Sequence, residues 1–219
     1  WLNDMLDYLP VQTMIYDGIE ADDTIAYLTQ YTQNEYDGEV VIVSTDKDFL
    51  QLVSDKVSVF SPTKKKMYNR KVVFDEFAIW PQNLLLYRTL DGDKSDNIPG
   101  IKGCGIKTLL KRFPELSEDR LITHDEFFQI CEGNVGKIKL YEDVLKAKDQ
   151  LLMNKRLMEL DNPHIPTNQK LKIIDRFRED DVAFNKLDFL KVGNKYKVLQ
   201  NWRDINDWLQ STFHNIIIK

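Results

Sequence analysis

The residues of this chain that could do chemistry are mostly carboxylates, and they occur in three groups. Each group follows a short apolar run or begins a helical stretch. The groups are Glu20, Asp22 and Asp23 in IEADDTIAYL, Asp46 and Asp48 in STDKDFLQL, and Asp93 and Asp96 in DGDKSDNIPG. Oxygen ligands without His or Cys favour Mg²⁺ or Mn²⁺ over Zn²⁺. We therefore predict that these residues form a site for divalent cations.

Helix capping is the alternative explanation for these acids, because Asp and Glu are favoured at helix N-termini. Capping needs one acid per helix, whereas each group holds two or more that repel one another. Bound cations would offset that repulsion, so a metal site is favoured over capping alone.

The segment from Asp91 to Lys102 resembles a calcium-binding helix–loop–helix site in the spacing of its polar residues, but such a site is excluded. Asp91, Asp93, Ser95 and Asn97 stand at alternate positions, as calcium ligands do. That loop requires Gly at its sixth position and Glu at its twelfth, where this chain has Asp96 and Lys102.

A second candidate site is the glycine-rich turn IPGIKGCGIKTLLKRF. Closely spaced glycines let backbone N–H groups approach a phosphate, and lysines beside them can contact a nucleic-acid backbone. The alternative is an ordinary tight turn between packed helices with solvated lysines. The predicted contacts to duplex DNA are Gly100, Lys102, Gly103, Gly105, Lys107 and Thr108.

Strands alternating with helices must position these residues in the first part of the chain. Strand-like runs are predicted at 11–17, 39–45, 57–61 and 72–74, and the Val/Ile-rich run at 39–45 is typical of a strand buried on both faces. This alternation predicts an α/β sheet, in which the loops at the carboxyl ends of parallel strands converge. The acids after those strands would then share one crevice.

The chain becomes mostly helical after Trp80. Helices are predicted over 81–90, 106–113, 140–160, 168–177 and most of the last 30 residues. We therefore divide the chain into residues 1–80, an α/β part, and residues 81–219, a helical part.

Composition narrows the class of protein further. The chain has 219 residues with 30 Lys and Arg against 35 Asp and Glu, for a net charge of −5, and its basic residues cluster at 64–71 and 102–112. Its apolar runs are too short for a transmembrane helix, and its two cysteines make no disulfide framework. We expect a protein of a reducing, cytoplasmic compartment without membrane contact.

Three motifs in this order and spacing resemble the 5′-nuclease superfamily of flap endonucleases and 5′→3′ exonucleases, nearest to its phage ribonuclease H branch. They are YDGIEADDTIAYL, VVIVSTDKDFLQL and LDGDKSDNIPGIKGCGIKTLLKRF, and together they span residues 11–113. The resemblance implies a PIN-like, mostly parallel sheet with flanking helices. A helix–three-turn–helix and a C-terminal helical region would follow it.

The resemblance also implies roles and substrates. Glu20, Asp22 and Asp23 would serve a first metal region, and the other four acids a second, with two Mg²⁺ or Mn²⁺ ions in the complete enzyme. The implied activity is structure-specific hydrolysis of phosphodiesters in duplex DNA with a 5′ flap or 5′ end, or in RNA–DNA hybrids during primer removal. A monomer working with replication or repair proteins in a bacterial or phage-infected cell is expected.

One departure from the family pattern concerns the start of the chain. Family members begin with a strand that carries another metal-binding Asp and with a helical arch. Here WLNDMLDYLP resembles the helix that precedes the EADD motif. The resemblance thus predicts that the N-terminal part of the family domain is missing, and that the activity belongs to the full-length parent.

Two rival interpretations remain open at the level of the sequence. A topoisomerase–primase-type metal domain would use Glu20 and the pair Asp46 and Asp48, but it leaves Asp93, Asp96 and the glycine turn unexplained. A non-catalytic duplex-DNA-binding module would need the turn without the carboxylates.

Overall fold

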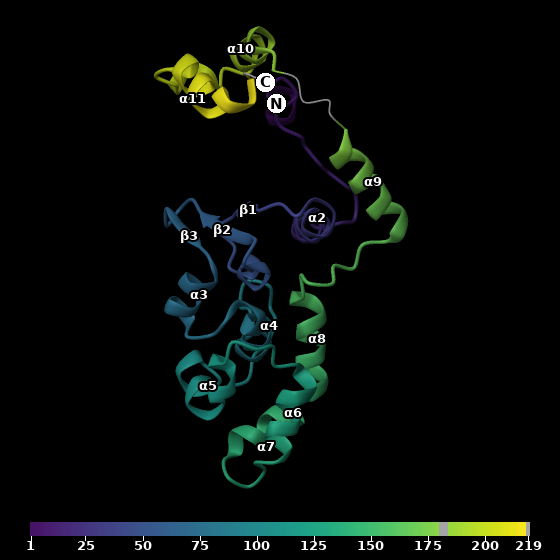
Figure 1. Ribbon diagram of the computed structural model, residues 1–219, viewed down its shortest axis with the longest axis vertical. Coiled ribbons are helices and arrows are strands. Elements are labelled where there is room, and N and C mark those ends of the chain that lie inside the picture. Colours follow the sequence, from purple (N-terminus) through teal and green to yellow (C-terminus); the bar gives the residue numbers. More distant parts are fainter. Residues whose placement is uncertain (180–183, 218–219) are drawn as a thin grey trace. The chain divides into compact units, whose positions relative to one another are not determined.

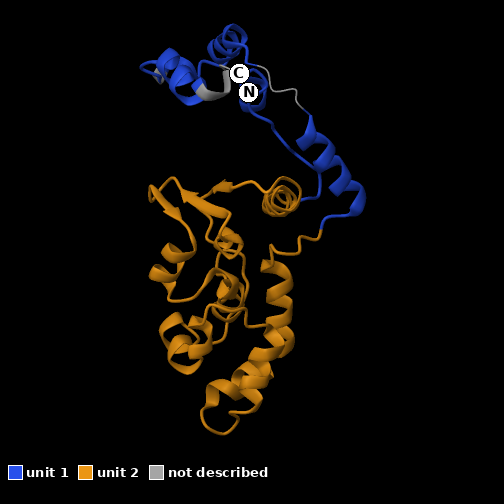
Figure 2. Ribbon diagram, viewed as in Figure 1, with its two compact units in different colours: residues 1–19, 165–219 blue, residues 20–164 orange. Residues whose placement is uncertain are grey.

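The computed structural model describes residues 1–179 and 184–217, which group into two compact units (Figure 2). One unit combines Trp1–Ile19 with Ile165–Lys219, and the other is the continuous stretch Glu20–His164. All the residues predicted to bind metal or DNA belong to the continuous unit. The division of the chain at residue 80 stays a prediction.

A three-stranded sheet lies in the unit 20–164. Its strands are β1 (Val40–Val43), β2 (Val57–Ser61) and β3 (Lys66–Tyr68), in the order β1-β2-β3. β1 and β2 are parallel with Val40 opposite Val57, whereas β3 returns antiparallel to β2. Together with the helices around it, this sheet confirms the predicted α/β class.

Helices surround this small sheet (Figure 1). Those of the same unit are α2 (Ala21–Tyr36), the 3-10 turn η1 (Asp48–Leu52), α3 (Arg70–Phe77), α4 (Pro81–Asp91), α5 (Ile106–Arg112), the 3-10 turn η2 (Pro114–Ser117), α6 (His124–Glu132), α7 (Lys139–Lys146) and α8 (Lys148–Met158). α4 packs against both η1 and α8, so it stands between the sheet and the helical layer. The predicted helix over 140–160 exists as two helices that meet at Ala147.

The other unit is helical in its described part. It contains α1 (Leu2–Leu6), α9 (Thr167–Arg178), α10 (Lys186–Lys195), η3 (Leu199–Asn201) and α11 (Ile205–Ile217). Its apolar core joins Met5 and Leu9 to Phe189, Leu209 and Phe213. The helices predicted near residue 170 and in the C-terminal region are confirmed here.

Two predicted strands are wrong. Residues 11–17 belong to no described strand. A segment with strand-like composition forms a β-ladder only when another strand pairs with it. The run VVF at 72–74 lies inside α3, where the side chain of Asn69 caps the helix by accepting a hydrogen bond from the Val72 N–H at 3.0 Å. That cap outweighs the preference of valine for strands.

The prediction that the run at 39–45 is buried on both faces is also wrong. β1 lies at an edge of the described sheet, and its side chains alternate between the core and solvent. Ile42 is 5% exposed, whereas Val41 and Val43 are 54% and 66% exposed. Apolar content alone could not distinguish a central strand from an edge strand.

Buried amide side chains fix the loops of this unit. Gln51 donates to the carbonyl oxygens of Asp48 and Met158 and accepts from the Leu160 N–H. Asn154 donates to the carbonyl oxygens of Thr89 and Pro99. These bonds hold η1, the end of α4 and the following loop against α8.

Cys104 and Cys131 are both buried, and neither is in a disulfide. Among the described residues, no helix has the length and apolar character needed to cross a membrane.

His124 is a buried titratable group, only 9% exposed at the first position of α6. Its Nε2 lies 3.2 Å from Thr89 Oγ1, whose own hydrogen is donated to the Leu86 carbonyl. Burial, followed by the charge of Lys155, lowers the pKa of His124 to about 4. The positive end of the helix dipole also disfavours an imidazolium here.

We expect acid to destabilise the protein through His124. Below about pH 6.5 the unfolded state binds a proton that the native imidazole rejects until about pH 4. The free energy of unfolding should therefore fall between these values by up to about 1.4 kcal/mol per pH unit. Urea unfolding at pH 7, 6 and 5 measures this, with His124→Gln as the comparison. An identical pH dependence in both proteins would contradict the assignment.

Candidate active site

The first acid group lies at the start of α2. Glu20 is the N-cap residue, with an extended backbone, and its side chain makes no capping hydrogen bond. Asp22 and Asp23 are half-buried in the first turn of the helix. Capping therefore does not account for this group.

The second and third groups form local turns. Asp46 follows β1, and its Oδ1 accepts the Asp48 N–H at 2.8 Å. Asp93 follows α4, and its Oδ1 accepts the Ser95 N–H at 2.8 Å. Each turn accounts for one carboxylate and leaves the neighbouring acids unexplained.

Electrostatics shows that the first two groups face each other. Burial raises the pKa of Asp22, and the negative charges of Asp46, Glu20, Asp48 and Asp23 raise it further. Burial and the charge of Glu20 likewise raise the pKa of Asp23. Segments more than twenty residues apart in sequence thus concentrate negative charge in one place.

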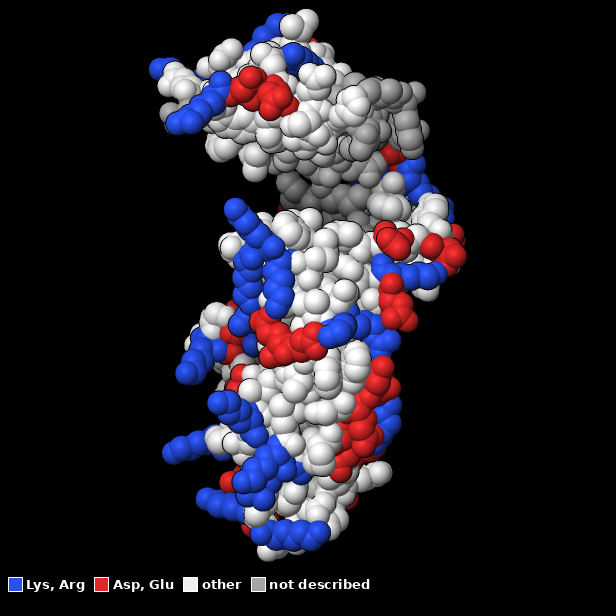
Figure 3. All heavy atoms as spheres, turned by 60° about the vertical axis from the view of Figure 1, so that its left-hand side comes forward, with Lys and Arg blue, Asp and Glu red and all other residues white. Residues whose placement is uncertain are grey.

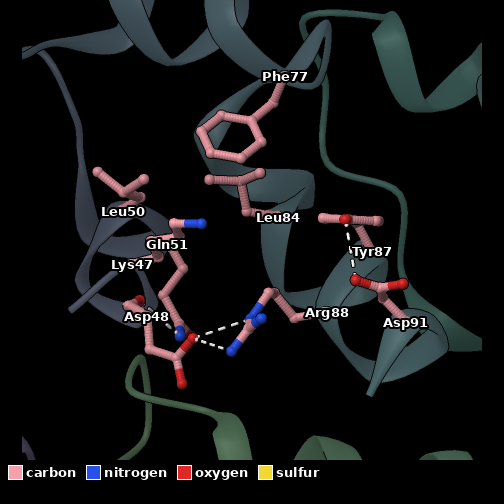
Figure 4. A pocket seen from close by; sticks show the side chains of 9 residues that line it. All are labelled: Lys47, Asp48, Leu50, Gln51, Phe77, Leu84, Tyr87, Arg88 and Asp91. Carbon is pink, nitrogen blue, oxygen red and sulfur yellow. Dashed lines mark hydrogen bonds and ion pairs between the residues drawn. The ribbon is translucent and has the colours of Figure 1, made fainter. Parts of the chain in front are cut away.

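Arg88 joins the second group to the third. It lies in the last turn of α4, and its Nε donates to Asp48 Oδ1 at 2.9 Å, while its Nη2 forms an ion pair with the same oxygen at 2.8 Å (Figure 4). The same Nη2 donates to Asp93 Oδ2 at 2.5 Å. Hydrogen bonds from Ser95 and Arg88 lower the pKa of Asp93 to about 2, whereas burial keeps the pKa of Asp48 raised.

The structure thus brings most of the predicted acids near one another, with Asp96 as the exception. Glu20, Asp22, Asp23, Asp46, Asp48 and Asp93 are linked by charge or by Arg88. Asp96 lies exposed in the loop that a bridge between Asp93 and Ile98 closes. Within residues 1–179 and 184–217, no three acid, His or Cys side chains are close enough to hold an ion directly.

Sequence reasoning missed Arg88. A signal was available, because an arginine in the apolar stretch NLLLYRTL stands five residues before Asp93. A cavity of about 100 Å³ lies beside it, lined in part by Asp48, Leu84, Tyr87 and Asp91 (Figure 4).

The glycine turn has a structural role that the sequence did not reveal. Gly92 has a φ of +76°, and a Cβ on Gly92 would collide with the backbone of Gly100. A Cβ on Gly100 would in turn collide with the Asp91 carbonyl. These two glycines let the ends of the loop 92–100 touch, so no phosphate is needed to explain Gly100.

The rest of the turn is open to solvent. Gly103 has a φ of +87°, and neither Gly103 nor Gly105 has an atom near its missing Cβ. Lys102, Lys107 and Thr108 are exposed. On the face drawn in Figure 3, basic side chains gather in separate areas with acidic side chains between them. Positive and negative side chains therefore occupy different areas of this face, although the net charge of the chain is negative.

Comparisons with known proteins point to one family. A family model described as "5′-3′ exonuclease, N-terminal resolvase-like domain" matches residues 1–78. A 5′-3′ exonuclease of Aquifex aeolicus (strain VF5) is 35% identical over 167 residues, covering 66% of this chain and 56% of that protein. One of Buchnera aphidicola subsp. Schizaphis graminum is 36% identical over 208 residues, covering 93% of this chain and 66% of that protein. The chain thus spans little more than half to two thirds of the length of these relatives.

Solved structures share the fold. A phage T5 flap endonuclease in a pseudo-enzyme-product complex with DNA and metal ions gives a TM-score of 0.58 at 24% identity, covering 83% of this chain and 62% of that one. A T5 5′-exonuclease with bound zinc gives 0.56 at 23% identity, covering 83% of this chain and 62% of that one. The PIN-like fold expected from the motifs is confirmed.

Gly100→Ala should destabilise the protein by about 1–3 kcal/mol, because the added Cβ must displace the Asp91 carbonyl. Gly105→Ala is the matched control, since its Cβ meets open space at a φ of −61°. We expect it to change stability by less than about 1 kcal/mol. Urea unfolding compares the two variants, and equal losses would show that the contact between the loop ends is unimportant.

Proposed function

This chain belongs to the 5′-nuclease superfamily, and from that premise we propose that it hydrolyses phosphodiester bonds at the 5′ ends of nucleic-acid strands. The observation that carries the proposal is the concentration of carboxylates from three separate segments. Asp22 feels the charges of Asp46 and Asp48, and Arg88 ties Asp48 to Asp93. Such a concentration is costly for folding, and it suits a site built for cations.

We propose that the carboxylates bind Mg²⁺ or Mn²⁺, two ions in the complete enzyme. The proposed ligands are Glu20, Asp22, Asp23, Asp46, Asp48, Asp93 and Asp96. These ligands are oxygen donors, which favour Mg²⁺ or Mn²⁺ over Zn²⁺. When bound, such ions supply an activated water and stabilise the charge that develops on the phosphate.

The protein's own groups have separable tasks in this proposal. Asp22, Asp23 and Asp48 have raised pKa values, so a bound cation would favour their charged forms. Asp93, with its pKa of about 2, stays ionised at any working pH. Asp93 would therefore keep its charge whether or not a cation is bound.

The proposed substrate is duplex DNA with a 5′ flap or 5′ end, or an RNA–DNA hybrid. The turn from Gly100 to Thr108 would contact the duplex backbone without reading its sequence, through Lys102, Lys107 and exposed main-chain donors. Action as a monomer with replication or repair proteins in the cytoplasm belongs to the same proposal. Residues 1–80 would carry the chemistry, and residues 81–219 the grip on DNA.

Asp46→Asn combined with Asp48→Asn should abolish metal-dependent cleavage of a 5′-flap duplex, because it removes charge from two proposed ligands. Duplex binding should remain within about threefold, since it rests on other residues. The control is Asp125→Asn with Asp149→Asn, which removes the same charge from exposed positions on α6 and α8. Cleavage that survives the first pair, or that proceeds in chelator, would refute the metal nuclease. Binding without cleavage by the full-length parent would favour a non-catalytic module.

Lys102→Ala combined with Lys107→Ala should weaken duplex binding about equally for all sequences. The salt dependence should flatten by roughly one unit of slope for each lost phosphate contact. Fluorescence anisotropy at several salt concentrations measures both effects. Lys56→Ala with Lys71→Ala removes two exposed lysines from residues 1–80, outside the proposed grip on DNA, and serves as the control. An unchanged affinity and slope would leave the turn with a structural role only.

A further inference from the structure

Arg88 sits among residues that would otherwise only repel one another. Its side chain is 22% exposed, and its partners Asp48 and Asp93 are 20% and 15% exposed. Both nitrogens that contact Asp48 reach the same oxygen, Oδ1, while Nη2 also reaches Asp93. One guanidinium therefore fastens η1 to the loop that follows α4.

The helix that carries Arg88 is held firmly. Leu86, Thr89 and Leu90, its neighbours on α4, are fully or almost fully buried. The Leu90 carbonyl accepts the Ile101 N–H at 2.8 Å, and the Thr89 carbonyl accepts the Asn154 amide at 3.0 Å. A cation in the last turn is also stabilised by the helix dipole. Arg88 is thus a fixed charge and not a mobile surface side chain.

A fixed guanidinium and a divalent cation would compete for the same oxygens. Arg88 neutralises part of the charge of Asp48 and Asp93, so it lowers the attraction of that pair for a metal ion. It also removes the repulsion that the two half-buried carboxylates would suffer without a counter-ion. Arg88 therefore stabilises the metal-free protein and at the same time lowers its affinity for a metal ion.

We propose that Arg88 is a positioning residue, a built-in counter-ion that holds Asp48 and Asp93 together in the metal-free protein and weakens cation binding by the same pair. This inference rests on the proposed metal-dependent function. The Glu20 and Asp22 side of the cluster, to which Arg88 makes no described ion pair, would take a cation more readily than the Asp48 and Asp93 side.

The test compares Arg88→Gln with Arg70→Gln. Arg70 is a matched control because it also joins two acids, Asp55 and Asp119, with a side chain 30% exposed. Both variants should unfold at a lower temperature than the unaltered protein in chelator. Calorimetric titration should give tighter Mn²⁺ binding for Arg88→Gln alone, by about fivefold or more, since one nearby positive charge is lost. Mn²⁺ should accordingly raise the unfolding temperature of Arg88→Gln most.

The outcomes separate the two proposals. Normal Mn²⁺ binding by the unaltered protein, with unchanged affinity in Arg88→Gln, would overturn this inference and leave the proposed function standing. No Mn²⁺ binding by the unaltered protein would overturn the proposed function and the competition with it. If Arg88→Gln fails to fold, Arg88→Met replaces it. Methionine also removes the positive charge, so a similar gain in Mn²⁺ affinity is expected, and no gain would overturn the inference.

Discussion

Repulsion between carboxylates is the constraint on which the arrangement of this unit depends. Asp22 and Asp48 both have raised pKa values, first because they are buried and then because of neighbouring acids. A fold that gathers such groups must hold their segments in place by other means. Gln51 fastens η1 to the end of α8, and Asn154 fastens the end of α4 to the same helix. These neutral bonds supply rigidity where the charges would push the segments apart.

Local patterns made much of this fold predictable. The run VSVFS at 57–61 is β2, and Pro81 begins α4 as the sequence indicated. The strand at 40–43 was recognised as well, because Val and Ile dominate it. The acid groups were found for a similar reason, since each stands at the start of a helix or shortly after a regular element. Such features depend on residues that are close in sequence, so they can be recognised from the sequence of one protein.

Features that depend on distant partners escaped prediction. Residues 11–17 have the composition of a strand but find no partner, and the edge position of β1 depends on which strands are present. Arg88 acquires its meaning only when Asp48, forty residues earlier in the chain, is brought to it. The need for glycine at position 100 comes from the Asp91 carbonyl, which the spacing of the glycines did not disclose.

The loop from Gly92 to Gly105 couples the two candidate sites physically. Asp93 stands near its start, within hydrogen-bond distance of Arg88, and Lys102 stands near its end. The backbone pairing of Asp93 with Ile98 and the close approach of Gly92 to Gly100 leave the intervening chain little freedom. The backbone that leads into the proposed grip on the duplex is therefore anchored next to Asp93. Short-range steric contacts, rather than charge, would then set the spacing between the grip on the duplex and the carboxylates.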